Sequence, residues 1–86
     1  MSEKRVIDIN FYNDFLFTNF KSIKLESNTK VEYSEISNVY IDDEIIVIVF
    51  SNRYIVLDVS DLNENKDLII SKLLAKAKTH TNNVSN

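Results

Sequence analysis

The residues whose types could do chemistry are three consecutive acids, Asp42, Asp43 and Glu44, and a single histidine, His80. Neighbouring carboxylates can act as a general acid and base, or can bind a divalent cation. Consecutive residues of a hairpin turn point to different sides, however, and the spacing of a calcium loop is missing. His80 stands in a polar stretch with no orienting partner in view. The sequence therefore predicts a solvated acidic turn and a solvated histidine.

The amino-acid composition argues against further classes of functional site. The 86 residues include no Cys, so disulfides and thiolate metal sites are excluded. The net charge of −3 comes from mixed acids and bases, whereas a nucleic-acid site usually shows a clustered basic face. We therefore expect a protein that is not an enzyme, carries no metal or other cofactor and binds no nucleic acid.

The distribution of apolar residues predicts the compartment. The first ten residues, MSEKRVIDIN, contain no apolar core of a signal peptide, and no apolar run is long enough to span a membrane. We expect no membrane insertion, and a cytoplasmic protein.

Three strand-like runs between Ile36 and Val59 form the centre of the expected fold. The middle run, Ile45 to Phe50, is continuous Ile, Val and Phe, which is typical of a buried strand. Short polar breaks at residues 42–44 and 51–52 predict hairpin turns on either side. Four more strands are expected before this centre, at residues 6–12, 15–20 and 22–26 and from Val31. About seven strands at this spacing predict a mainly β (α+β) antiparallel sandwich or partly open barrel.

The period changes after Val59, and a C-terminal helix follows. Asp61 with Glu64 forms a possible capping box, and Ser60 and Asn63 are rival caps. The expected buried stripe contains Leu62, Ile69, Ile70, Leu73, Leu74 and Ala77. A single domain over residues 1–79 and a polar tail over residues 80–86 are expected.

The second half of the chain resembles a known family. The segment Tyr33 to Val39 (YSEISNV), the hairpin at Asp42-Asp43 and the run Arg53 to Leu57 are similar to short bacterial pleckstrin-homology (PH)-like domains of the YcxB-like type. The resemblance covers residues 33–78. It implies a PH-like fold with one closing helix, used for protein contacts and often in homo-oligomers, with no catalytic residues.

Candidate contact residues are those placed away from the expected core. Leu68 and Ala75 lie on the outer side of the helix. Three tyrosines, Tyr12, Tyr40 and Tyr54, occupy strand faces opposite the apolar rows, and tyrosine is enriched at interfaces. The acidic turn and any open sheet edge are further candidates.

Two functions remain open. The first is a non-catalytic interaction or scaffold module of a bacterial or phage cytoplasm, binding itself as a homodimer or higher oligomer, or binding another protein. The alternative is a small phage or mobile-element inhibitor of a host protein that acts partly by acidic mimicry of nucleic acid, motivated by residues 42–44, Glu32 and Glu35.

Overall fold

The computed structural model describes the backbone of residues 4–80 and the side chains of residues 4–77. Its strands are β1 (Val6–Phe11), β2 (Phe15–Lys21), β3 (Glu26–Glu32), β4 (Ile36–Ile41), β5 (Ile45–Phe50) and β6 (Arg53–Asp58). Two short 3-10 turns, η1 (Tyr33–Glu35) and η2 (Val59–Asp61), follow β3 and β6, and the helix is α1 (Lys66–His80). Within residues 4–80, no helix combines the length and the apolar composition that a membrane crossing requires.

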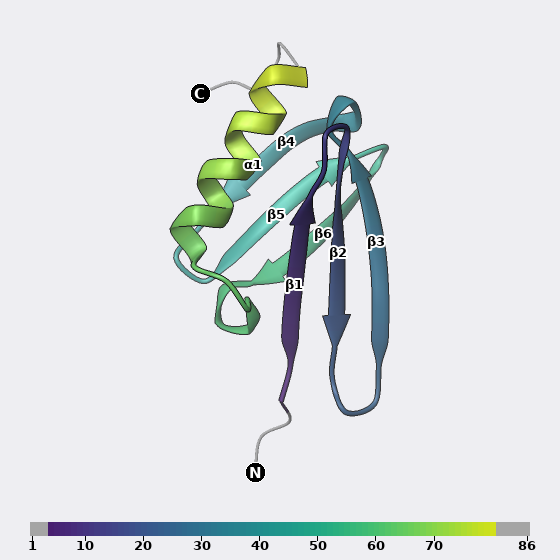
Figure 1. The fold of residues 1–86 in the computed structure, drawn as a ribbon, viewed down its shortest axis with the longest axis vertical. Helices are drawn as coiled ribbons and strands as arrows, with labels where there is room; N and C mark the ends of the chain where they lie inside the picture. Colours follow the sequence, from purple (N-terminus) through teal and green to yellow (C-terminus); the bar gives the residue numbers. More distant parts are fainter. Residues whose placement is uncertain (1–3, 81–86) are drawn as a thin grey trace.

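The strands form two antiparallel sheets of three strands each, and they do not close into a barrel. The first sheet has the order β1-β2-β3 and the second has the order β4-β5-β6. The expectation of a mainly β fold with a C-terminal helix is confirmed (Figure 1).

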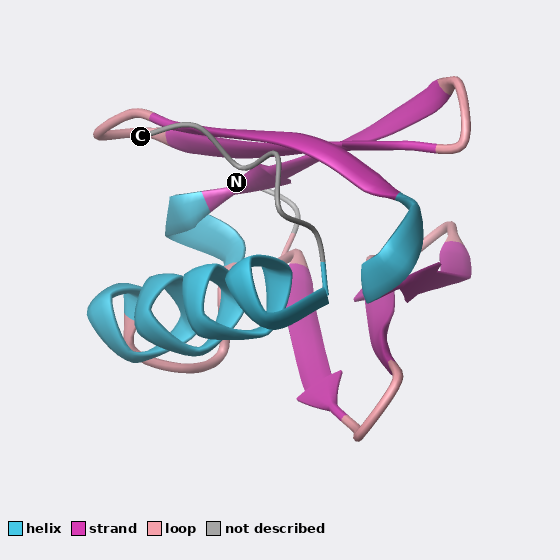
Figure 2. Cartoon of the chain, turned by 90° about the horizontal axis from the view of Figure 1, so that it is seen from above, coloured by secondary structure: helices cyan, strands magenta, loops and turns pink. Residues whose placement is uncertain are grey.

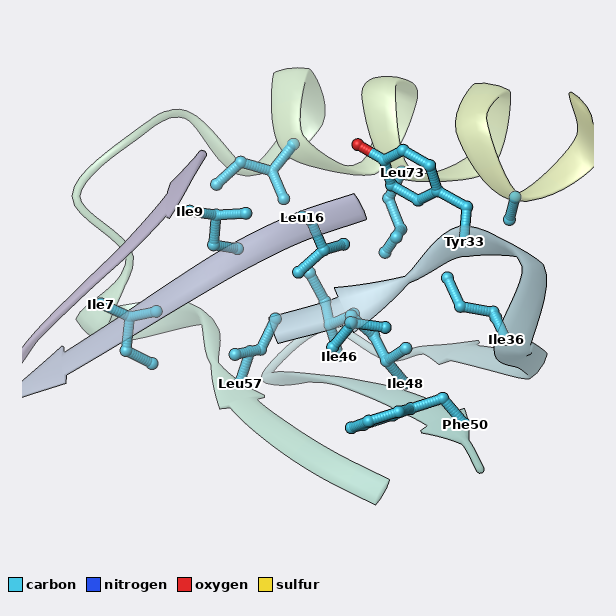
Figure 3. Packing of buried hydrophobic residues seen from close by; sticks show 13 residues of the cluster. Ile7, Ile9, Leu16, Tyr33, Ile36, Ile46, Ile48, Phe50, Leu57 and Leu73 are labelled. Carbon is cyan, nitrogen blue, oxygen red and sulfur yellow. The ribbon is translucent and has the colours of Figure 1, made fainter. Parts of the chain in front are cut away.

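The helix and the first sheet lie on the same side of the second sheet (Figures 1 and 2). Their apolar side chains meet between these layers in one buried cluster (Figure 3). The cluster contains Ile7, Ile9, Leu16, Val31, Tyr33, Ile36, Ile46, Ile48, Phe50, Leu57, Ile69, Leu73 and Ala77. Each fully buried large aliphatic side chain stabilises the fold by about 1.5–3 kcal/mol.

The strand count of seven was wrong. Of the residues expected as a third strand, Ser22 to Leu25 form the turn between β2 and β3, where the amide of Ser22 donates a 2.7 Å hydrogen bond to the carbonyl of Leu25, and Glu26 begins β3. Residues 27–29, which Ser-Asn-Thr composition predicts as the turn between the strand at 22–26 and the one from Val31, are instead part of β3 and pair with β2. Polar residues form a strand here because the pairing partner, and not their own propensity, decides the conformation.

The expected start of the helix was also wrong. None of Ser60, Asp61 and Asn63 caps α1; the side chain of Asn65 accepts hydrogen bonds from the amides of Asp67 (2.9 Å) and Leu68 (3.2 Å). Leu62 lies before the helix, where it forms a parallel bridge with Ile7. The remaining stripe is as expected, with the most deeply buried positions at Ile69, Leu73 and Ala77.

An irregularity near the start of β4 sets which side chains face the core. Ile36 pairs with Phe50, and after a register shift Val39 pairs with Ile48. The extra residue lets both Ile36 and Val39 face inward although they are three positions apart. Tyr40 is therefore directed to the opposite face of the second sheet.

Candidate interaction surface

The second sheet presents one face that no element of the described chain covers, here called the outer face. Alternation along the strands assigns its residues, because side chains two positions apart share a face. Across the sheet, Tyr40 pairs with Val47 and Val47 with Val56, while Asn38 pairs with Val49 and Val49 with Tyr54. The outer face consists of Asn38, Tyr40, Ile45, Val47, Val49, Tyr54, Val56 and Asp58.

The outer face is apolar and exposed. Tyr40, Tyr54 and Val56 keep 56%, 66% and 50% of their surface accessible. The one formal charge on this face, Asp58, lies at the end of β6. Three strands about 4.8 Å apart and about 20 Å long cover about 300 Å². Uncovered apolar patches of this size on small proteins are often functional.

The outward side of the first sheet is different in character, and it holds the third tyrosine. It carries polar side chains such as Asp8, Asn19 and Lys30, as is usual where an antiparallel sheet faces water. Tyr12 stacks on Phe15 at 4.9 Å between ring centroids, and the Lys30 ammonium lies 4.6 Å from the Phe15 ring. The structure therefore brings Tyr40 and Tyr54 to one face and places Tyr12 elsewhere.

Asp58, a carboxylate that is distant in sequence, lies next to the acidic turn at residues 42–44. The amide of Val59 donates a 2.9 Å hydrogen bond to the carbonyl of Glu44, which brings Asp58 beside residues 42–44. Asp43, Glu44 and Asp58 help to line an open depression of about 410 Å³. This depression adjoins the Ile45 end of the outer face.

Local hydrogen bonds organise these carboxylates. Oδ1 of Asp58 accepts hydrogen bonds from the hydroxyl of Ser60 (2.8 Å) and from its amide (3.0 Å), and these two bonds lower the pKa of Asp58. The carboxylate of Asp42 accepts a 2.8 Å bond from the amide of Asp43. In the described part of the chain, no three His, Cys, Asp or Glu side chains are grouped so that they could hold a metal ion. The side chain of His80 lies outside the described residues.

Comparison with protein-family models, curated proteins and solved structures finds no match. The resemblance to PH-like domains stays a prediction, and the surface chemistry of this chain carries the functional argument.

The outer side of the helix provides a second exposed site. Leu68 keeps 47% of its surface accessible, and Ala75 is also exposed, whereas the neighbouring Ile69 is 2% exposed. Both residues therefore lie where the helical period places them. They are separated from the outer face, because the helix packs on the opposite side of the second sheet (Figure 2).

Sequence reasoning missed two apolar side chains at the tip of the β2–β3 hairpin. Ile23 and Leu25 are 77% and 59% exposed, although their alternation with Lys24 and Glu26 predicted a strand with one buried side. The hairpin extends beyond the second sheet, so that no layer formed by residues 4–80 faces its tip (Figure 1). An exposed apolar tip and a buried strand share the same local pattern, and only the arrangement of the sheets distinguishes them.

Proposed function

We propose that this chain is a non-catalytic protein-interaction module of the PH-like type, which associates through the outer face of the second sheet. The observation that carries the proposal is the contrast between the two sheets. The first sheet faces water with charged and amide side chains around Phe15 and Phe17. The second presents Tyr40, Val47, Tyr54 and Val56, with one charge at its end. Removing this apolar surface from water would favour association by about 25 cal/mol per Å².

Self-association is the first form of this function to test. The outer face is nearly uncharged, so two copies can stack without like-charge repulsion. Its area of about 300 Å² is well below the roughly 800 Å² per partner of a standard stable interface. A dimer formed by this face alone would therefore be weak, and a tight assembly requires neighbouring surface as well.

The test is the mass of the native protein by light scattering across a range of concentrations. We expect association for the wild type and a monomer for Tyr40→Lys, which places a charge on the outer face. Asn10→Lys is the matched control, because Asn10 is exposed on the outward side of the first sheet. Loss of association in Leu68→Glu but not in Tyr40→Lys would move the interface to the helix. A wild-type monomer at all concentrations would exclude self-association.

A second candidate function rests on the acidic end of the second sheet. Asp43, Glu44 and Asp58 line one open depression there, next to Asp42, and an inhibitor that mimics nucleic-acid phosphates would need exposed carboxylates of this kind. Salt dependence separates the two functions. Partner binding that weakens steeply as the salt concentration rises from about 50 to about 300 mM would favour mimicry. Binding through an apolar interface would change little with salt concentration.

A further inference from the structure

The free edge of β6 presents backbone groups in an ordered row. The turn before β6 has two residues in the left-handed region, Ser51 (φ 47°) and Asn52 (φ 61°), as a two-residue hairpin requires. Phe50 and Arg53 then close the ladder as a hydrogen-bonded pair, and hydrogen bonding to β5 recurs at every second residue. Val59, two residues after Leu57, follows the same alternation, because its amide donates a hydrogen bond to the carbonyl of Glu44.

It follows that the backbone amides and carbonyls point toward β5 at Arg53, Ile55 and Leu57. They point away from β5 at Tyr54, Val56 and Asp58. Among residues 4–80, no strand pairs with this outward edge. Edge strands are usually protected by lysine, proline or a bulge, and the middle of β6, from Tyr54 to Leu57, has none of these. The edge therefore offers unused donors and acceptors at a spacing of about 6.8 Å, which only an extended backbone matches.

A cleft opens beside this edge. The strands of the first sheet cross β6 and continue beyond it (Figure 1), so that their inward side faces the space next to the edge. The resulting cleft has a volume of about 210 Å³. It is lined by Ile7, Thr18, Phe20, Ser27 and Thr29 of the first sheet and by Ile55, Val56 and Leu57 of β6.

We propose that an extended segment of another protein binds along β6, adding a fourth strand to the second sheet and placing alternate side chains in the cleft. This inference rests on the proposed protein-binding function and assigns it a site and a class of partner. Strand addition takes its affinity from main-chain hydrogen bonds and its specificity from pockets for alternate side chains, and both parts are present here.

The lining of the cleft determines the side chains that it accepts. Phe20, Ile55 and Leu57 favour aliphatic side chains, while Ser27 and Thr29 add hydroxyl groups that can bond to threonine or serine. The ends of β6 carry opposite charges, with Arg53 at the start and Asp58 at the end. The complementary segment is therefore aliphatic at alternate positions, with an acid beside Arg53 and a base beside Asp58.

A second copy of this chain fits the edge less well. Antiparallel pairing of two β6 strands about a two-fold axis would place both first sheets on the same side of the joined sheet. Each of them projects past its own β6 (Figure 1) into the space that the other would occupy. A single extended segment needs only the space of one added strand, about 4.8 Å wide.

The probe is a phage-displayed library of random ten-residue peptides, selected on the wild-type protein and then resynthesised in soluble form. We expect enrichment of sequences with aliphatic residues at alternate positions. On binding, amide hydrogen exchange of Tyr54 and Val56 should slow at least tenfold, because these amides gain partners. The amide of Ile55 should change little, since it is already bonded to β5.

Two substitutions of Val56 distinguish the contribution of its backbone amide to peptide binding from that of its side chain. Val56→Pro removes an amide that makes no bond within the sheet, and edge strands tolerate proline at such a position. It should weaken peptide binding at least tenfold, while Val56→Thr, which keeps the amide, should bind nearly as the wild type does. Ser27→Arg is a second test that leaves β6 intact, because Ser27 is exposed and its enlarged side chain would fill the cleft.

Three results would overturn strand addition: no enriched peptide, enriched peptides that bind Val56→Pro normally, or unchanged exchange at Tyr54 and Val56. Peptides that are lost with Tyr40→Lys but kept by Val56→Pro would leave the proposed function in place at the outer face. Absence of both peptide binding and self-association would contradict the proposed function itself.

Discussion

The phenol of Tyr33 donates a 2.7 Å hydrogen bond to the backbone carbonyl of Tyr12, 21 residues earlier in the chain. The amide of Tyr33 also donates a 3.1 Å bond to the carbonyl of Asp14. Tyr33 is fully buried in η1, between the two sheets, so these bonds hold the β1–β2 turn against the connection between the layers. The phenol and the amide of Tyr33 thus join the β1–β2 turn to the segment that connects the two sheets.

Tyr33→Phe should lower the free energy of unfolding by about 1 kcal/mol, because it removes this hydrogen bond and keeps the ring. Burial raises the pKa of Tyr33 above the ordinary value for tyrosine. The stability that depends on the neutral phenol is therefore complete below a pH of about 10 and is lost as the pH rises toward the folded-state pKa. Urea unfolding at neutral and alkaline pH should show a smaller alkaline loss in Tyr33→Phe. Tyr54→Phe, at an exposed position, should leave that loss unchanged.

The central hairpins and the buried stripe of the helix could be read from the sequence because both depend on local signals. The β-branched run of β5 and the turn at Ser51-Asn52 need no knowledge of the rest of the chain. The β2–β3 hairpin could not be read in this way. Its tip at Ile23 and Leu25 alternates like a buried strand, and its polar strand around Asn28 forms only because β2 lies beside it.

The candidate surfaces also differ in whether local sequence signals predict them. Exposure of Leu68, Tyr40 and Tyr54 followed from the period of each element. The cleft at β6 did not, because it depends on how far the first sheet projects past the second. Tyr33 was placed in a strand by its sequence neighbours, and its role in joining the sheets depends on a bond to Tyr12 that no local pattern encodes.

The N-terminal cap of the helix gives a second prediction. Asn65→Ala removes the acceptor for the amides of Asp67 and Leu68 and should destabilise the protein by about 1 kcal/mol. Glu64→Ala, one position earlier, should change stability by less than about 0.5 kcal/mol, because Glu64 is exposed and a surface change of this kind is usually small. Equal effects in thermal unfolding would contradict the assignment of the cap.

The turn between β5 and β6 gives a third prediction. Asn52 has a φ of 61°, a region that glycine enters without steric cost. Asn52→Gly should therefore stabilise the protein by about 0.5 kcal/mol. The same substitution at Asn28, in the middle of β3, should destabilise it by about 1 kcal/mol, because the strand loses a side chain that bonds to Asn19. Denaturant midpoints of the two variants should move in opposite directions.

The carboxylate of Asp58 gives a prediction for acid pH. Its folded-state pKa is lowered by the hydrogen bonds from Ser60, so its contribution to stability is present above the unfolded pKa of about 4 and is lost as the pH falls through the folded value. Asp58→Asn should make the acid limb of the stability curve shallower. Ser60→Ala should act in the same direction, since it removes the 2.8 Å bond from the hydroxyl. Acid limbs that match the wild type in both variants would show that these bonds do not persist in solution.

Two neighbouring residues on α1 test the orientation of the helix and the notion that its outer side is available for contact. Ile69 is 2% exposed and Leu68 is 47% exposed. Ile69→Ala should destabilise the protein by about 2–4 kcal/mol, because it leaves a cavity in the core. Leu68→Glu should change stability by no more than about 0.5 kcal/mol. If Leu68→Glu instead unfolds the protein, the helix packs with a different face inward, and neither Leu68 nor Ala75 can serve as a contact residue. If Leu68→Glu is stable and retains the wild-type native mass, the outer side of the helix takes no part in self-association.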